Sequence, residues 1–348
     1  MIQAYTRTDT KGAGRRAETI LDRLHEYQEE ENPNVGPDAR SFNLLIAYYG
    51  RSKEPDAPYR AEYLLNRMVS RFKDGQSNLV PSQFAITTVI DSYAFAGHPD
   101  AGKNADRLLK LLRQLRQEYG ASRLVVNVAV MNSVLGAWAN CGDENAGKRA
   151  KNYLNEMEAI DMQPDTRSYG LVLSAWSKST CTDKFRRALR ILRRMEQQEG
   201  NGNQQVCVDK YARSLVINAC GFSNADAQVE SEAFEIAVTK FDEMVGSDRN
   251  RPTSLSFGWF IQAMGRLCVD EEKKTAQIAK AFMMCCEAGL VNDFVLHRLK
   301  GAASDTLYEK LLKPASLTKS DRKPTWVHLT RLPPEWKRNA SKWQRNSR

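Results

Sequence analysis

The sequence predicts an all-α protein: a right-handed α-solenoid of about seven helix-turn-helix repeats, the first of them truncated, followed by a C-terminal cap and a basic tail. Apolar residues recur at the i, i+3, i+4, i+7 spacing of one helix face, in two alternating patterns. The unit recurs every 38 to 45 residues. Units of this size bury their apolar faces only by stacking on their neighbours, so a continuous helical array is expected.

The first helix of each repeat is predicted from four apolar slots. The leading slots lie 44, 45, 38, 44 and 44 residues apart. They are occupied by Phe42, Ile86, Met131, Tyr169, Arg213 and Phe257. Arg213 is the one polar residue among them, and the three slots that follow it are apolar, so a helix is still expected there.

The second helix of each repeat is predicted from an alanine followed by apolar residues three, four and seven positions later. The small alanine suits close helix packing, and a Met, Leu or Cys at the end of the pattern fills the space beneath the next unit. The alanines are Ala17, Ala61, Ala105, Ala150, Ala188, Ala237 and Ala279. In the last copy, the pattern predicts that Phe282, Met283 and Cys286 face the core.

The repeats divide the chain into an array over 1–313 and a tail over 314–348. Ile2 aligns with Ile46, 44 residues later, so we expect the chain to begin inside a helix and any targeting segment to lie upstream. The expected repeats are 1–38, 39–82, 83–127, 128–165, 166–209, 210–253 and 254–292, with a cap over 293–313.

The positive charge is concentrated in the tail. The formal net charge is +9, and residues 319–348 contain nine Lys or Arg against two acidic residues, so the repeats are close to neutral. The seven cysteines form no C-x-x-C pair and are expected to be reduced core residues. No stretch is apolar enough to span a membrane, and no signal-peptide pattern opens the chain.

The sequence contains no recognisable motif for catalysis or for a cofactor. The four histidines are scattered, without the second His of a zinc protease or the paired cysteines of a zinc deaminase. No Walker loop is present. We therefore expect no enzyme activity, no metal ion and no cofactor.

A recurring stretch carries the strongest family signal. "PDARSFNLLIAYYGRS", which begins at Pro37, returns as "PDTRSYGLVLSAWSKS" at Pro164, and a second helix running from Ala to Met follows each. Over about residues 1 to 300 this pattern resembles the pentatricopeptide repeat family of organellar RNA-binding proteins. The units are longer than that family's usual mid-thirties, mainly in the turn between the helices. HEAT and armadillo repeats, of roughly 40 to 47 residues, are structural alternatives.

The resemblance implies a protein that binds single-stranded RNA in a mitochondrion or plastid and acts in RNA processing, stability or translation, with one repeat for each nucleotide. It implies that each base is recognised by two residues. The first recognition slot is the residue after the leading apolar slot of a repeat, and the second recognition slot is the residue directly before the next repeat. The base-recognition candidates are Asn43, Ser82, Thr87, Asn127, Asn132, Asp165 and Ser214. By the same resemblance, three pairs would prefer cytosine, adenine and uracil in turn: Asn43 with Ser82, Thr87 with Asn127, and Asn132 with Asp165.

Two further groups of residues are candidates for RNA contact. The second residue of a repeat is where the family sandwiches a base, and planar side chains there can stack. The stacking candidates are Arg40, Phe84, Arg167 and Tyr211. The tail interleaves tryptophans with basic residues, a composition that suits contact with a phosphate backbone. The backbone-binding candidates are Lys337, Arg338, Lys342 and Arg345.

Each assignment has an alternative. Every residue in the second recognition slot is Ser, Thr, Asp or Asn, the types that cap helix N-termini, so capping alone would explain them. Asn43 and Asn132 could instead hydrogen-bond a neighbouring helix, and Trp336 could fold back over the last repeat. The whole array could be a protein-binding scaffold, since helical solenoids also hold peptides and assembly partners.

Overall fold

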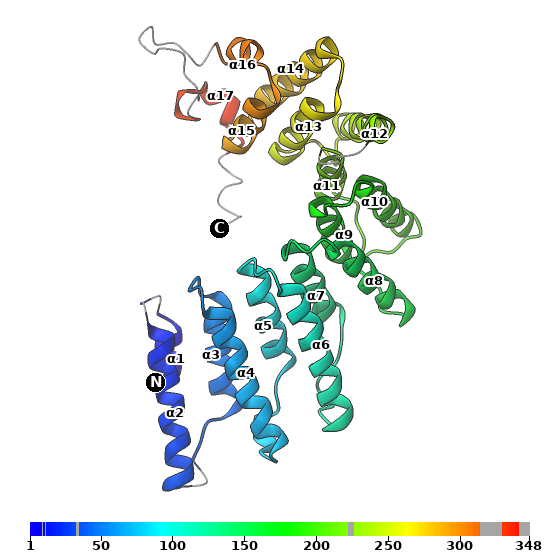
Figure 1. Ribbon diagram of the computed structural model, residues 1–348. Coiled ribbons are helices and arrows are strands. Elements are labelled where there is room, and N and C mark those ends of the chain that lie inside the picture. The colour runs from blue at the N-terminus through cyan, green and yellow to red at the C-terminus, as the bar shows by residue number, and fades with distance from the viewer. Residues whose placement is uncertain (9, 11, 33–34, 222–225, 314–328, 341–348) are drawn as a thin grey trace. The chain divides into compact units, whose positions relative to one another are not determined.

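The computed structural model describes the chain except for residues 9, 11, 33–34, 222–225, 314–328 and 341–348, and the described residues form helices and turns without a β-strand (Figure 1). Contacts divide the chain into two compact units, Met1–Ala175 and Trp176–Arg348. Each unit is a stack of helical hairpins, which confirms the predicted α-solenoid class.

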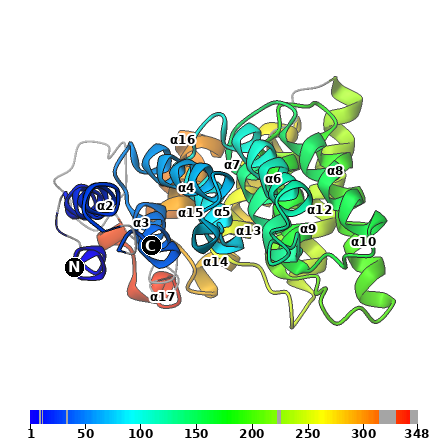
Figure 2. The ribbon, with the colours of Figure 1, turned by 90° about the horizontal axis from the view of Figure 1, so that it is seen from below.

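The first unit contains four complete hairpins and the start of a fifth first helix. Its elements are α1 (Ile2–Thr6), α2 (Ala13–Glu30), α3 (Ala39–Arg51), α4 (Ala57–Lys73), η1 (Ser77–Leu79), α5 (Gln83–Phe95), α6 (Ala101–Glu118), α7 (Val128–Asn140), α8 (Ala146–Ala159) and α9 (Thr166–Lys178), which crosses the boundary. The odd-numbered first helices α1 to α7 contact one another in order, and α2, α4 and α6 each pack between two of them. Figure 2, which views several of these helices nearly end-on, shows the two adjoining layers.

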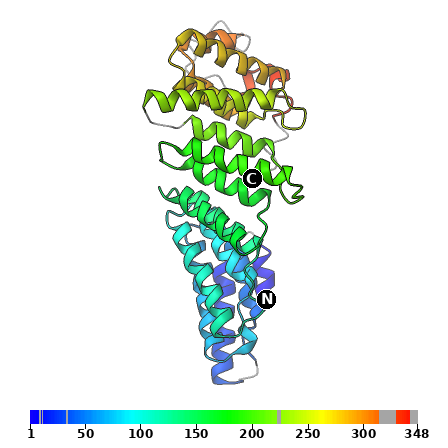
Figure 3. The same ribbon diagram turned by 90° about the vertical axis from the view of Figure 1, so that its right-hand side faces the viewer.

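The second unit repeats the same arrangement. Its elements are α10 (Lys184–Gly200), α11 (Lys210–Cys220), α12 (Ala227–Val245), α13 (Ser254–Leu267), α14 (Glu271–Glu287), α15 (Asp293–Ala302), α16 (Asp305–Leu312), η3 (Leu329–Arg331) and α17 (Pro334–Lys337). First helices α11, α13 and α15 contact one another in order, and α12 and α14 pack behind them. Figure 3 shows these helices stacked in successive rows.

The predicted apolar slots of the first helices are buried in every copy. The polar exception, Arg213, is half-buried and pairs with Glu243 at 2.8 Å and with Glu196 at 3.4 Å. Carboxylates from α10 and α12 therefore neutralise the charge that takes the place of an apolar anchor.

The prediction for the last second helix was wrong at Met283 and correct at Phe282 and Cys286. Met283 of α14 is 45 % exposed, and the buried face is formed by Ile278, Ala281, Phe282, Cys285 and Cys286. Ala281 is buried, whereas Ala279, the alanine of the predicted pattern, is half-buried. The Phe282 ring meets the edge of Trp336 with centroids 5.8 Å apart.

A small residue in the first turn of several second helices makes room for the aromatic side chain that ends a first helix. A Cβ added to Gly14 would lie 2.7 Å from the Tyr49 hydroxyl oxygen, and one added to Gly102 would lie 2.5 Å from the Trp138 ring. Real Cβ atoms do not approach neighbours this closely, so glycine is required at both positions for the hairpins to stack as they do.

In two repeats, the aromatic side chain that ends the first helix donates a hydrogen bond to a carboxylate of the second-helix layer. Tyr93 donates a hydrogen bond to Glu62 at 2.6 Å, and Trp138 Nε1 donates one to Asp106 at 2.8 Å. Both acids directly follow the alanine of their repeat. Burial and the adjacent Glu62 raise the pKa of the Tyr93 hydroxyl, as expected when a desolvated phenol faces a carboxylate.

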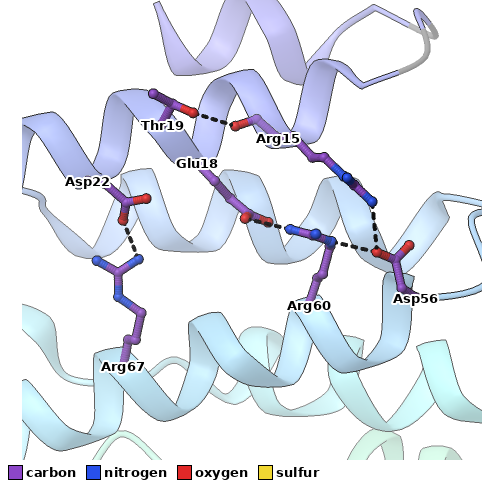
Figure 4. A network of polar contacts seen from close by, with 7 residues as sticks. All are labelled: Arg15, Glu18, Thr19, Asp22, Asp56, Arg60 and Arg67. Atoms are coloured by element: carbon purple, nitrogen blue, oxygen red, sulfur yellow. Dashed lines mark hydrogen bonds and ion pairs between the residues drawn. The ribbon is translucent and has the colours of Figure 1, made fainter.

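Arginines connect successive second helices across the surface (Figure 4). Arg60 of α4 reaches Glu18 of α2 at 2.8 Å and Asp56 at 2.7 Å, and Arg67 reaches Asp22 at 2.6 Å. Surface ion pairs contribute little individually, and these pairs join side chains of adjacent hairpins.

Replacing Glu62 by Ala is expected to lower the free energy of unfolding by about 1–3 kcal/mol, because the buried Tyr93 hydroxyl loses its acceptor. Chemical denaturation followed by circular dichroism measures the change. The control is Asp100→Ala, which removes only an exposed ion pair with Lys103 and should change stability by less than about 0.5 kcal/mol. Equal effects of the two substitutions would contradict the assigned role of Glu62.

Candidate nucleic-acid interface

The first turn of every described first helix from α3 to α15 is capped by a side chain. In each case the residue before the helix accepts a hydrogen bond from the backbone amide three residues later, at 2.7 to 3.3 Å. The capping residues are Asp38, Ser82, Asn127, Asp165, Asp209, Thr253 and Asn292. The capping role proposed as an alternative for the second recognition slot is therefore confirmed, and one acceptor position of each side chain is occupied.

Asn43 and Ser82 lie together as the sequence pairing implied. Ser82 Oγ donates to Asn43 Oδ1 at 3.3 Å while it accepts the amide of Ala85 at 3.0 Å. Asn43 is half-buried, and its Nδ2 has no hydrogen-bond partner among the described residues. The NH2 group of Asn43 in α3 is therefore available as a donor beside the start of α5.

Thr87 and Asn127 do not hydrogen-bond to each other. The Thr87 hydroxyl donates to the carbonyl oxygens of Gln83 and Phe84 in its own helix, at 3.1 Å each. Asn127 is exposed, and its Oδ1 accepts from Gln83 Nε2 at 3.1 Å. Gln83, which no sequence pattern indicated, thus takes part in this junction.

Asn132 and Asp165 form a buried network with a third residue, Ser168. Asn132 Nδ2 lies 3.2 Å from both oxygens of Asp165, and Asn132 Oδ1 accepts from Ser168 Oγ at 2.7 Å. Asn132 is only 4 % exposed and Ser168 is fully buried. Both polar ends of the amide are therefore engaged within the protein.

Ser214 is buried in a similar junction. Its hydroxyl donates to the carbonyl oxygen of Lys210 at 2.6 Å and lies 2.7 Å from Ser256 Oγ. Ser214 is 1 % exposed. Ser256 also closes a capping box with Thr253 at the start of α13.

Gly258 occupies the first recognition slot of the next repeat. The Phe294 ring covers it, and a Cβ added to Gly258 would lie 2.3 Å from that ring.

The stacking candidates occupy equivalent and accessible positions, as the second residue of α3, α5, α9 and α11. Phe84 is 59 % exposed and Tyr211 is 44 % exposed, and Arg40 and Arg167 are exposed as well. Near Arg167, partial desolvation raises the pKa of the Asp91 carboxyl group, while a hydrogen bond with Ser133 and the Arg167 charge act in the opposite direction. Sequence patterns did not indicate Asp91.

The described part of the tail packs on the last repeat. The Val291 amide donates to the Trp336 carbonyl oxygen at 2.9 Å, and Arg338 donates to the Glu287 carbonyl oxygen at 3.1 Å. Lys337 Nζ donates to the carbonyl oxygen of Leu329 at 2.9 Å. These contacts agree with the alternative in which Trp336 folds back over the last repeat. They involve Lys337 and Arg338, two of the four backbone-binding candidates. The other two, Lys342 and Arg345, lie outside the described residues.

Two further features are absent from the described part of the chain, a metal-binding cluster and a membrane-spanning helix. No group of three or more His, Cys, Asp or Glu side chains is arranged to hold a metal ion there. None of the helices described is both long enough and apolar enough to cross a membrane.

Comparison with known proteins finds similarity at the level of structure. No protein-family model matches the chain, and no curated protein matches its sequence. The crystal structure of the pentatricopeptide repeat protein PPR10 from maize is similar over 90 % of this chain, with 18 % identity and a TM-score of 0.45. PPR10 in complex with an 18-nt psaJ RNA element is similar over 93 %, with 15 % identity and a TM-score of 0.47. The chain spans 43 % and 48 % of the length of these two structures.

Replacing Asn132 by Ala is expected to lower the free energy of unfolding by about 1–3 kcal/mol, because the Asp165 carboxylate and the Ser168 hydroxyl lose a buried partner. Urea denaturation measures the loss. Asn43→Ala, which removes one long contact with Ser82, is the control and should cost less than about 1 kcal/mol. A loss at Asn132 no larger than the loss at Asn43 would contradict the network's structural role.

Proposed function

We propose that the protein binds single-stranded RNA along its first-helix layer, with successive repeats contacting successive nucleotides. The observation that carries the proposal is the repeated placement of exposed planar side chains, Arg40, Phe84, Arg167 and Tyr211, at the second residue of first helices. Each stands two residues after the capping residue of its helix, beside the polar junction with the preceding repeat. The resemblance of the repeats to the pentatricopeptide family, and PPR10 as an RNA-bound relative in fold, accord with this function.

The chemistry of the layer suits unpaired bases. Every base has a flat face that stacks on an aromatic ring or guanidinium, and an unpaired base exposes its hydrogen-bonding edge. Phe84 offers a ring, Arg40 a guanidinium and Asn43 an amide donor in adjacent first helices. The proposal extends to a role in RNA processing, stability or translation within a mitochondrion or plastid, which rests on the family resemblance.

A second candidate function is supported by the outer layer. Tyr59 and Tyr63 of α4 are 54 % and 57 % exposed and lie one turn apart, and exposed tyrosines are typical of protein contacts. A protein-binding scaffold would depend on this face, whereas RNA binding would not. Substitution of both tyrosines by Ser should therefore leave RNA affinity unchanged.

Phe84→Ala is expected to weaken RNA binding by about 5- to 150-fold, since stacking on one base contributes roughly 1–3 kcal/mol. Fluorescence anisotropy with a pool of single-stranded RNA at two salt concentrations measures it, and binding should weaken as salt rises. Phe95→Ala is the matched control, because Phe95 is 69 % exposed at the opposite end of α5. Absence of binding at low salt would refute the function, and equal losses for the two variants would refute the assigned face.

A further inference from the structure

We infer that Asn132 and Ser214 join neighbouring first helices and do not contact bases, so that base selection is confined to the two repeats that carry Asn43 and Thr87. This inference rests on the proposed RNA-binding function and specifies which repeats select a base. It follows from the hydrogen-bonding capacity that each recognition candidate retains after the protein's own contacts are counted.

Both polar ends of the Asn132 amide already have partners within the protein. An Asn side chain offers a carbonyl oxygen, which accepts hydrogen bonds, and an NH2 group, which donates them. The NH2 group faces both oxygens of Asp165 at 3.2 Å, and the carbonyl oxygen accepts from Ser168 at 2.7 Å. At 4 % exposure the amide is also out of reach of a ligand unless the junction opens. Opening it would break the contacts of Asn132 with both Asp165 and Ser168, and a single base contact would have to replace them.

Ser214 is engaged in the same way within the second unit. A serine hydroxyl has one hydrogen to donate, and here it goes to the Lys210 carbonyl oxygen at 2.6 Å. Ser256 approaches the same oxygen to 2.7 Å, and both serines are almost completely buried. The Ser214 hydroxyl is therefore not accessible to a base.

The two engaged junctions share one feature, a serine at the third residue of the following first helix. Ser168 in α9 and Ser256 in α13 each reach back to the recognition slot of the preceding repeat. At the junctions after Asn43 and Thr87, the equivalent residues are Ala85 and Val130, which carry no polar group. Asn43 Nδ2 therefore keeps no partner among the described residues, and Thr87 remains half-exposed with lone pairs to accept a bond.

This arrangement makes the third residue of each first helix a specificity-determining position. A serine there engages the recognition residue before it, and an apolar residue leaves it accessible. Ala85→Ser should therefore place a hydroxyl beside Asn43 and reproduce the Asn132–Ser168 contact. The matched control is Ala212→Ser, the same substitution at the third residue of α11, where the preceding recognition slot is Gly170 and has no side chain to engage.

The test is selection from a randomised single-stranded RNA pool followed by sequencing, with thermal melting of each variant to verify folding. The wild-type protein should show base preference of about tenfold at two adjacent positions, the size expected for a good amide contact. Asn43→Ala and Ala85→Ser should each reduce the same preference to less than about twofold, and Asn132→Ala and Ala212→Ser should alter none.

Two results would overturn the inference while leaving RNA binding intact: a third selected position that disappears in Asn132→Ala, or an Ala85→Ser protein that selects bases as Ala212→Ser does. A folded wild-type protein that binds no RNA in the pool would overturn the proposed function, and the inference with it. Should Asn132→Ala fail to fold, the comparison of Ala85→Ser with Ala212→Ser still decides the outcome.

Discussion

The start of each first helix must be capped by a polar side chain, and the rest of the repeat depends on that constraint. A helix begins with backbone amides that lack internal partners, and Asp38, Ser82, Asn127 and their equivalents each satisfy one of them. The cap fixes where the chain enters the helix and thereby which residues of the following turns face the core. A capping side chain can also contact the neighbouring repeat, as Ser82 contacts Asn43 and Asp165 contacts Asn132.

The two layers of the protein satisfy their polar groups in different ways. In the second-helix layer, carboxylates such as Glu62 and Asp106 accept from buried aromatic side chains, and arginines join adjacent hairpins at the surface. In the first-helix layer, small amides and hydroxyls meet at the helix starts, beside exposed rings such as Phe84. Small polar groups next to exposed planar side chains suit base recognition. The proposed RNA-binding surface therefore follows from how each layer solves its own packing.

Sequence periodicity predicted the helices and nearly all of the core, because apolar spacing depends only on helix geometry. It misplaced Met283 of α14, because the buried face of that helix also depends on contacts such as that between Phe282 and Trp336. The family resemblance implied which residues are recognition candidates but not the hydrogen bonds that they form. The role of Ser168 depends on its approach to Asn132, 36 residues away, and no local pattern contains that information. A serine at the third helix residue was the one available signal, since this is also the place where capping boxes form.

The crystal structure of the protein with a bound single-stranded RNA tests the central claim most directly, namely that the repeat junctions divide into those that contact bases and those that hold the protein together. We expect a base stacked on Phe84, another base within hydrogen-bonding distance of Asn43 Nδ2, and an Asn132 that still bonds to Asp165 and Ser168. A base hydrogen-bonded to Asn132, with the contact to Ser168 broken, would contradict it.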